Sequence, residues 1–142
     1  MIKVNTLLAQ GVNEKVDTDR FSLVNVFHTI SKEEIREKPI YIHMNIKLER
    51  EFSEKKLQIG IDLIAYRDDK RFVKELFSID MDLDSKTENI EKISLNPFSK
   101  EINIIQQIND VAELEEGTYD FIIYRREENK KKILDVTQFV VN

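Results

Sequence analysis

Every second residue between positions 40 and 49 is apolar, and the residues between them are polar. The apolar members are Ile40, Ile42, Met44, Ile46 and Leu48. A period of two is that of a strand with one buried face, whereas a helix would repeat every 3.6 residues. Segments 57–65 and 73–83 show the same alternation, interrupted once in the second segment by Glu75. These three segments are predicted to be strands.

The rest of the chain has the composition of a sheet protein, with 19 Ile and 10 Val against only 3 Ala. β-Branched residues favour strands, and the best helix former is almost missing. Further strands are predicted over residues 2–10, 22–30, 102–108, 119–124 and 133–141, with a bulge in 102–108. One or two helical turns are expected over 31–39, because Ser31 and Glu34 have capping-box spacing and Pro39 ends a helix.

Turn signals separate most of these segments. Asp68 and Asp69 tolerate left-handed backbone and predict a tight hairpin turn, and a polar turn is expected over 127–131. Residues 85–100 are interpreted as a long connection between sheets, and 109–117 as a single helical turn. About eight short strands without a βαβ rhythm predict an all-β fold, an antiparallel β-sandwich in one domain spanning 1–142, with a closed barrel as the competing architecture.

The alternating segments also predict which side chains form the core. Ten residues are expected to be buried: Ile42, Met44, Ile46, Ile59, Ile61, Leu63, Ile79, Met81, Phe121 and Ile123.

Composition excludes several classes of chemistry. The chain has no Cys, so it has no disulfide, thiolate nucleophile or Cys-bearing zinc site. Three Gly cannot form a phosphate-binding loop or a dinucleotide fingerprint. A net charge of −5 opposes nonspecific binding to nucleic acid or anionic membranes. No apolar run approaches the length of a membrane span, and a cytoplasmic protein is expected.

Three segments together resemble an uncharacterised bacterial family of immunoglobulin-like β-sandwich domains. They are Leu7–Val12, Phe21–Phe27 and Glu116–Phe121. The resemblance implies that Tyr119 packs over the 109–117 crossover and that its hydroxyl bonds to backbone. The family has no assigned activity, so no residue takes a role from it.

The sharpest candidate for a binding site is an acidic run. Counted from the first acid, oxygen ligands stand at positions 1, 3, 5, 9 and 12, as in a calcium loop: Asp80, Asp82, Asp84, Glu88 and Glu91. Ser85 stands where such a loop needs Gly, and the flanks have strand character. We therefore interpret the three Asp residues as the solvent face of a strand, and calcium binding as the alternative.

The remaining candidates have plain structural interpretations. By parity, His28 shares a face with Val24 and Ile30 and is expected to be packed, whereas His43 lies on the polar face of its strand. No Ser lies in a nucleophile-elbow context. Basic residues gather at two hairpin ends, at 70–74 and 125–132, where interleaved acids indicate solvated turns.

The sequence therefore predicts no catalytic, cofactor-binding or metal-ligating residue. The leading hypothesis is a non-enzymatic module that binds another protein through a sheet edge or a loop cluster, rather than nucleic acid or a membrane. The alternative is a calcium-dependent ligand-binding β-sandwich built on the segment from Asp80 to Glu91.

Overall fold

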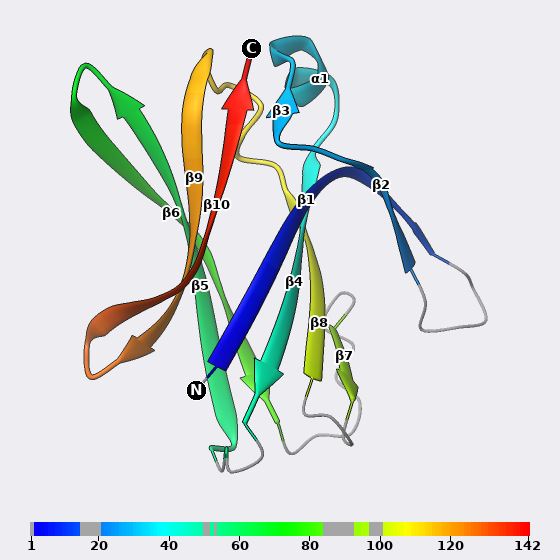
Figure 1. Ribbon diagram of the computed structural model, residues 1–142, viewed down its shortest axis with the longest axis vertical. Helices are drawn as coiled ribbons and strands as arrows, with labels where there is room; N and C mark the ends of the chain where they lie inside the picture. Colours follow the sequence, from blue (N-terminus) through cyan, green and yellow to red (C-terminus); the bar gives the residue numbers. More distant parts are fainter. Residues whose placement is uncertain (1, 15–20, 50–51, 53, 84–92, 97–100) are drawn as a thin grey trace.

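The computed structural model describes residues 2–14, 21–49, 52, 54–83, 93–96 and 101–142. Within these residues the chain forms ten strands and one short helix (Figure 1). In chain order the elements are β1 (Ile2–Glu14), β2 (Phe21–Val26), β3 (Thr29–Ile30), α1 (Lys32–Glu37), β4 (Ile40–Leu48), β5 (Lys56–Arg67), β6 (Lys70–Asp82), β7 (Ile93–Asn96), β8 (Glu101–Ile108), β9 (Gly117–Glu127) and β10 (Lys130–Val141).

The strands form two five-stranded sheets. Sheet A has the order β2-β1-β4-β8-β7, and sheet B has the order β3-β10-β9-β5-β6. All pairs are antiparallel except β3 with β10, which is parallel. The predicted all-β sandwich is confirmed, and the described strands number ten rather than about eight. No helix in the described part of the chain is long and apolar enough to cross a membrane.

The core lies between the two sheets. All ten side chains predicted to be buried are buried. At one end of the core three aromatic rings stack: the Phe139 centroid lies 5.5 Å from that of Tyr119 and 5.0 Å from that of Phe121. Alternation in sequence therefore identified the inward face of the central strands correctly.

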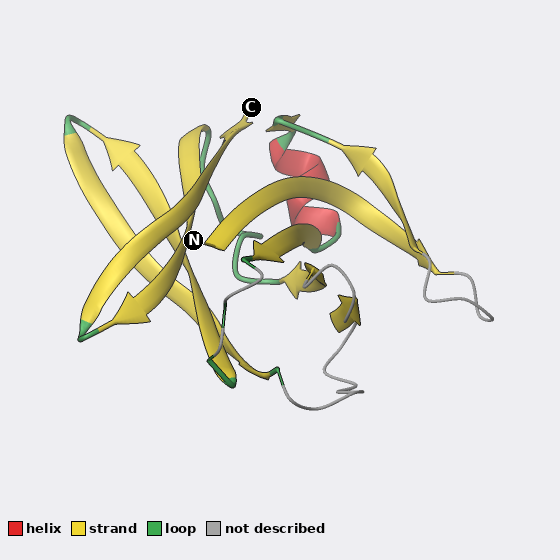
Figure 2. Cartoon of the chain, turned by 60° about the horizontal axis from the view of Figure 1, so that its bottom comes forward, coloured by secondary structure: helices red, strands yellow, loops and turns green. Residues whose placement is uncertain are grey.

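Both predicted hairpin turns have left-handed backbone at their two central residues. The values of φ are 50° and 62° at Asp68 and Asp69, and 50° and 65° at Glu128 and Asn129. Positive φ at both positions is the signature of a type I′ turn, whose twist matches that of the flanking strands. The β5–β6 and β9–β10 hairpins extend on the side away from sheet A, and their tips diverge (Figures 1 and 2).

Helix α1 begins as predicted. The Ser31 side chain accepts a hydrogen bond from the Glu34 backbone N–H, and the Glu34 carboxylate accepts one from the Ser31 N–H. Hydrogen bonds with the side chains of Ser31 and Gln10 lower the pKa of Glu34. Ile35 is the one buried residue of the helix, and the helix ends before Pro39.

The segment 22–30, predicted as one strand, is two strands in different sheets. β2 pairs with β1 in sheet A, whereas β3 pairs with β10 in sheet B. Asn25 has a φ of 53°, and the chain bends at His28 between the two strands. The bend interrupts the alternation of inward and outward side chains along the segment, so Phe27 is buried and His28 is exposed. The prediction of a packed His28 is wrong for this reason.

A bulge explains why Glu75 interrupts the alternation of β6. Ile61 pairs with Phe77, but the next residue, Asp62, pairs with Glu75, which leaves Leu76 as an extra residue. A one-residue insertion reverses the faces of the strand. Val73 and Glu75 therefore point away from the core, and the prediction that Val73 shares a face with Phe77 is wrong.

Three smaller predictions are also corrected. The connection 85–100 contains β7, which pairs with β8, although the chain does cross from sheet B to sheet A there as predicted. β8 pairs with β4 without a register shift, so it has no bulge against that strand. Residues 110–113 form a hydrogen-bonded turn and not the helical turn predicted within 109–117. In this region the Leu114 N–H donates to the Val111 carbonyl at 3.2 Å.

Polar side chains join the two sheets where β1 approaches β10. The Thr6 hydroxyl donates to Asp135 Oδ2 at 2.6 Å and is also hydrogen-bonded to the Thr137 hydroxyl. These residues connect sheet A to sheet B at the margin of the core.

Candidate protein-binding face

The candidate site is the face of sheet B that points away from sheet A, here called the outer face. On the two central strands its residues form three cross-strand pairs: Gly60 with Tyr124, Asp62 with Ile122 and Ile64 with Asp120. Outward side chains of β6 and β10 flank these pairs. The β5–β6 and β9–β10 hairpins therefore supply these residues.

Apolar side chains gather on the outer face. It carries four of the seven large hydrophobic side chains that are exposed in the described part of the chain, namely Tyr66 (48%), Val73 (53%), Ile133 (55%) and Val136 (49%). Val73 lies opposite Ile64, and Val136 lies opposite Ile122. Between these exposed members lie two buried apolar side chains, Ile64 and Ile122, which are paired across the strands with Asp120 and Asp62. Exposed apolar side chains that gather on one face often mark a binding site.

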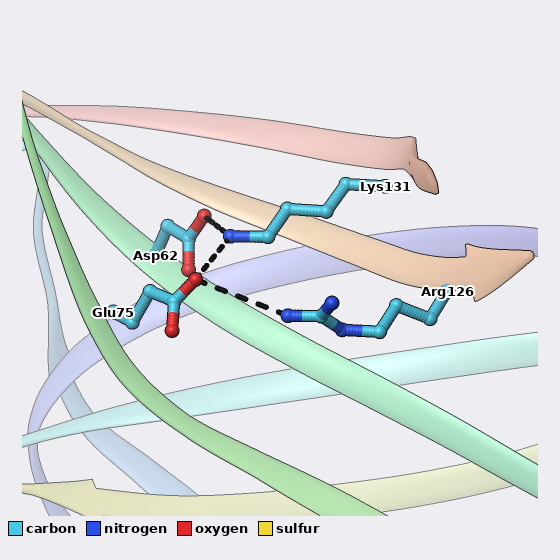
Figure 3. Close-up of polar contacts among 4 residues, drawn as sticks. All are labelled: Asp62, Glu75, Arg126 and Lys131. Atoms are coloured by element: carbon cyan, nitrogen blue, oxygen red, sulfur yellow. Dashed lines mark hydrogen bonds and ion pairs between the residues drawn. The ribbon is translucent and has the colours of Figure 1, made fainter. Parts of the chain in front are cut away.

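One ammonium group ties the two hairpins together across this face. Lys131 Nζ donates to Asp62 Oδ2 at 2.9 Å and to Glu75 Oε1 at 2.7 Å. Arg126 Nη2 lies 3.9 Å from the same Glu75 oxygen (Figure 3). On its way Lys131 crosses the Tyr124 ring, with Nζ 4.6 Å from the ring centroid. The Lys131 side chain therefore covers Tyr124 and joins β10 to β5 and β6.

Lys131 and Glu75 each stabilise the charged form of the other. The hydrogen bonds from Lys131 to Glu75 and Asp62 raise the pKa of Lys131, although partial desolvation opposes the shift. The bond from Lys131 lowers the pKa of Glu75 in turn. Near neutral pH Lys131 and Glu75 are thus both charged.

Two buried carboxylates on the outer face are only half satisfied. Asp62 is 4% exposed and Asp120 is 7% exposed. The Tyr66 hydroxyl donates to Asp120 Oδ2 at 2.8 Å, and this bond raises the pKa of Tyr66. In the described part of the chain, neither Asp62 Oδ1 nor Asp120 Oδ1 finds a hydrogen-bond donor. A buried acceptor without a donor costs free energy, so both atoms favour a ligand that supplies one.

The acidic run proposed from sequence is not assembled into a site within the described residues. Asp80 and Asp82 are exposed and alternate with buried Ile79 and Met81 on β6, as a solvent-facing strand requires. The other acids of the run, Asp84, Glu88 and Glu91, lie outside the described residues. Over the ranges that the structure describes, no group of three or more His, Asp or Glu side chains could hold a metal ion.

His43 lies apart from the outer face of sheet B. His43 is on the opposite layer, on the polar face of β4 as predicted, and its Nε2 lies 3.2 Å from Asn103 Oδ1. Burial lowers the pKa of His43, and the bond to Asn103 opposes that shift.

Of the two basic clusters, the one at 125–132 does more than keep a turn solvated. Its Lys131 is the residue that reaches across to Asp62. Sequence reasoning did not find the partner carboxylates. A signal was present: Ile64, Ile122 and Tyr124 occupy outward positions of their strands, so β5 and β9 are apolar on both faces. An acid in such a strand is expected to be covered.

Comparison with known proteins adds no assignment to this geometry. The chain matches no protein-family model, and no curated protein matches it significantly.

Proposed function

We propose that the protein is a non-enzymatic module that binds another protein through the outer face of sheet B. The observation that carries this proposal is the combination, on one face, of four exposed apolar side chains with two buried carboxylates that each lack one hydrogen-bond donor. Apolar area provides affinity at an interface, and unsatisfied polar atoms provide specificity.

The chemistry of the face indicates the kind of partner. Asp120 forms no ion pair with any described residue and receives one hydrogen bond, from Tyr66. A cationic side chain would supply the missing donor through a charge-assisted bond. The apolar rim around Ile64 and Ile122 would cover the stem of that side chain and its apolar neighbours. We therefore propose a partner segment with an Arg or Lys flanked by apolar residues.

The face is a better candidate than a sheet edge. β6 is the long edge strand of sheet B, and it carries a bulge at Leu76 and six charged residues: Lys70, Arg71, Lys74, Glu75, Asp80 and Asp82. Bulges and charges are the devices that keep an edge strand from pairing with another chain. The β6 edge is thus protected against strand addition.

The finer fold assignment is also part of this proposal. The Tyr119 hydroxyl donates to the Glu115 carbonyl at 2.6 Å, across the connection that precedes β9. This contact supports an immunoglobulin-like sandwich of the kind implied by the resemblance. A bacterial cytoplasmic role fits a chain without Cys.

A phage-displayed random peptide library, selected on the intact protein, tests the partner chemistry. Selected peptides should carry a basic residue between apolar ones. Val136→Glu should weaken their binding on the order of tenfold or more, because it places a charge in the apolar rim. Val26→Glu is the matched control, since Val26 and Val136 are both 49% exposed but Val26 lies in sheet A.

A second variant tests the carboxylate. Asp120→Asn keeps the shape of the side chain and removes its charge, so it should weaken the selected basic peptides while the melting temperature stays near that of the parent. Peptides without a basic residue, or equal losses in the Val26 and Val136 variants, would overturn the proposal.

A further inference from the structure

A groove lies on the opposite face of the β5–β6 hairpin from the outer face, toward the hairpin tip. Its volume is about 280 Å³, and it is lined by Leu63, Ala65, Arg67, Phe72, Val73, Lys74, Leu114 and Tyr119. Most of these residues belong to the hairpin, and Leu114 comes from the connection that leads into β9. The tip of the hairpin extends away from sheet A (Figure 1). Val73 also belongs to the outer face, whereas the other lining residues do not.

The walls of the groove are apolar. Leu63 and Tyr119 are 4% and 1% exposed and form its floor, and Ala65 and Leu114 are half-buried. Phe72 lies opposite Ala65 and is 54% exposed. A large aromatic side chain that is half open to water beside an apolar floor gains free energy when a ligand covers it.

The rim of the groove is cationic. Among the described residues, Arg67 and Lys74 are the only charged ones that line the groove, and none of its described lining residues is a carboxylate. Arg67 Nη2 donates to the Tyr119 hydroxyl at 3.3 Å, and that hydroxyl donates to the Glu115 carbonyl at 2.6 Å. Tyr119 thereby positions the guanidinium. The Glu115 carboxylate forms its ion pair with Lys32 Nζ at 2.8 Å and acts on Arg67 only at longer range, so Arg67 has no ion pair among the described residues.

We propose that this groove binds a small apolar carboxylic acid. The hydrocarbon chain would lie against Leu63, Phe72 and Leu114, and the carboxylate would accept hydrogen bonds from Arg67 and Lys74. A guanidinium matches the two oxygens of a carboxylate. The volume lies at the lower end of the range for ligand pockets, roughly 300 Å³, which suits a short acyl chain rather than a folded partner. This inference does not depend on the proposed function.

Isothermal titration with octanoate tests the proposal directly. Octanol has the same chain without the charge, and octylamine has the opposite charge. Octanoate should bind more tightly than either, and amide resonances of β5, β6 and the 109–116 connection should shift. Equal binding of octanoate and octanol, no detectable binding of octanoate at millimolar concentration, or shifts confined to other strands would each overturn the proposal.

Variants assign the charge recognition to particular residues. Arg67→Gln combined with Lys74→Gln should weaken octanoate at least about tenfold, because charge-assisted bonds contribute roughly 1.5–3 kcal/mol and 1.4 kcal/mol is tenfold. Octanol should be unaffected. Lys70→Gln with Arg71→Gln is the matched control on the same hairpin, since neither residue lines the groove. An equal loss in the control would show that binding follows general charge. Val136→Glu should leave octanoate binding intact, which separates this test from that of the outer face.

Discussion

The ring of Tyr124 lies directly against the backbone of Gly60. A Cβ atom at position 60 would stand 2.2 Å from Tyr124 Cζ, a separation that no side chain can occupy. The approach of an aromatic ring from β9 therefore favours glycine at the centre of β5, while Lys131 covers that ring. Three strands meet in this one stack.

Gly60→Ala should therefore destabilise the protein. The added methyl must displace the Tyr124 ring, and overpacking of this kind costs about 1–3 kcal/mol. Urea unfolding followed by circular dichroism measures the change. Gly11→Ala is the control, because its Cβ would stand an ordinary 3.5 Å from Val24. Equal midpoints for the Gly60 variant and the parent would contradict the close contact.

Lys131→Met tests the bridge across the outer face. It leaves the Asp62 carboxylate, which is 4% exposed, without its cation, so we expect a loss of about 1–3 kcal/mol in the free energy of unfolding. Adding Asp62→Val should recover much of that loss, because both partners are then removed. Lys130→Met, at the adjacent turn position, should change stability by no more than about 0.5 kcal/mol. Additive losses in the double variant would mean that Lys131 and Asp62 are not coupled.

Tyr119→Phe tests the hydroxyl that bonds to the Glu115 carbonyl. The ring and its stack on Phe139 are kept, and the loss of one hydrogen bond should cost about 1 kcal/mol. Arg67→Gln, which removes only the second contact of the same hydroxyl, should cost less. If Tyr119→Phe left the melting temperature unchanged, the contact with Glu115 would contribute nothing to stability.

Protonation of His43 should make stability depend on pH. Burial lowers the pKa of His43 in the folded state below its ordinary value, so the unfolded chain binds a proton first as the pH falls. The free energy of unfolding should therefore decrease from about pH 7.5 to about pH 5.5. His43→Gln should reduce this decrease, as measured by urea unfolding at both pH values. The same dependence in both proteins would place its source elsewhere.

The sequence was sufficient for the parts of the fold that depend on local pattern. Alternation identified the inward faces of β4, β5 and β9, the Asp68–Asp69 pair identified a tight hairpin turn, and Ser31 with Glu34 identified the start of α1. In each case one strand, turn or cap is specified by residues that are neighbours along the chain.

The parts that could not be predicted depend on contacts between distant segments. The extra residue Leu76 is visible only when β6 is paired with β5, and the change of sheet at His28 only when β3 is paired with β10. The same holds for the candidate face, because Asp62 and Lys131 are 69 positions apart in sequence and meet only through the order of strands in sheet B. The apolar outward positions of β5 and β9 indicate that Asp62 and Asp120 are covered, but they do not indicate which cation lies beside Asp62.

The parallel pairing of β3 with β10 sets an order of events during synthesis. The Val140 N–H donates to the His28 carbonyl, the Asn142 N–H donates to the Ile30 carbonyl, and the Lys32 N–H donates to the Asn142 carbonyl. These partners are separated by roughly a hundred residues, the kind of distant contact that slows folding. β3 and the start of α1 must therefore wait, after leaving the ribosome, until residues 140–142 have been made. The hydrogen bonds between β3 and β10 can form only after residues 140–142 have been translated.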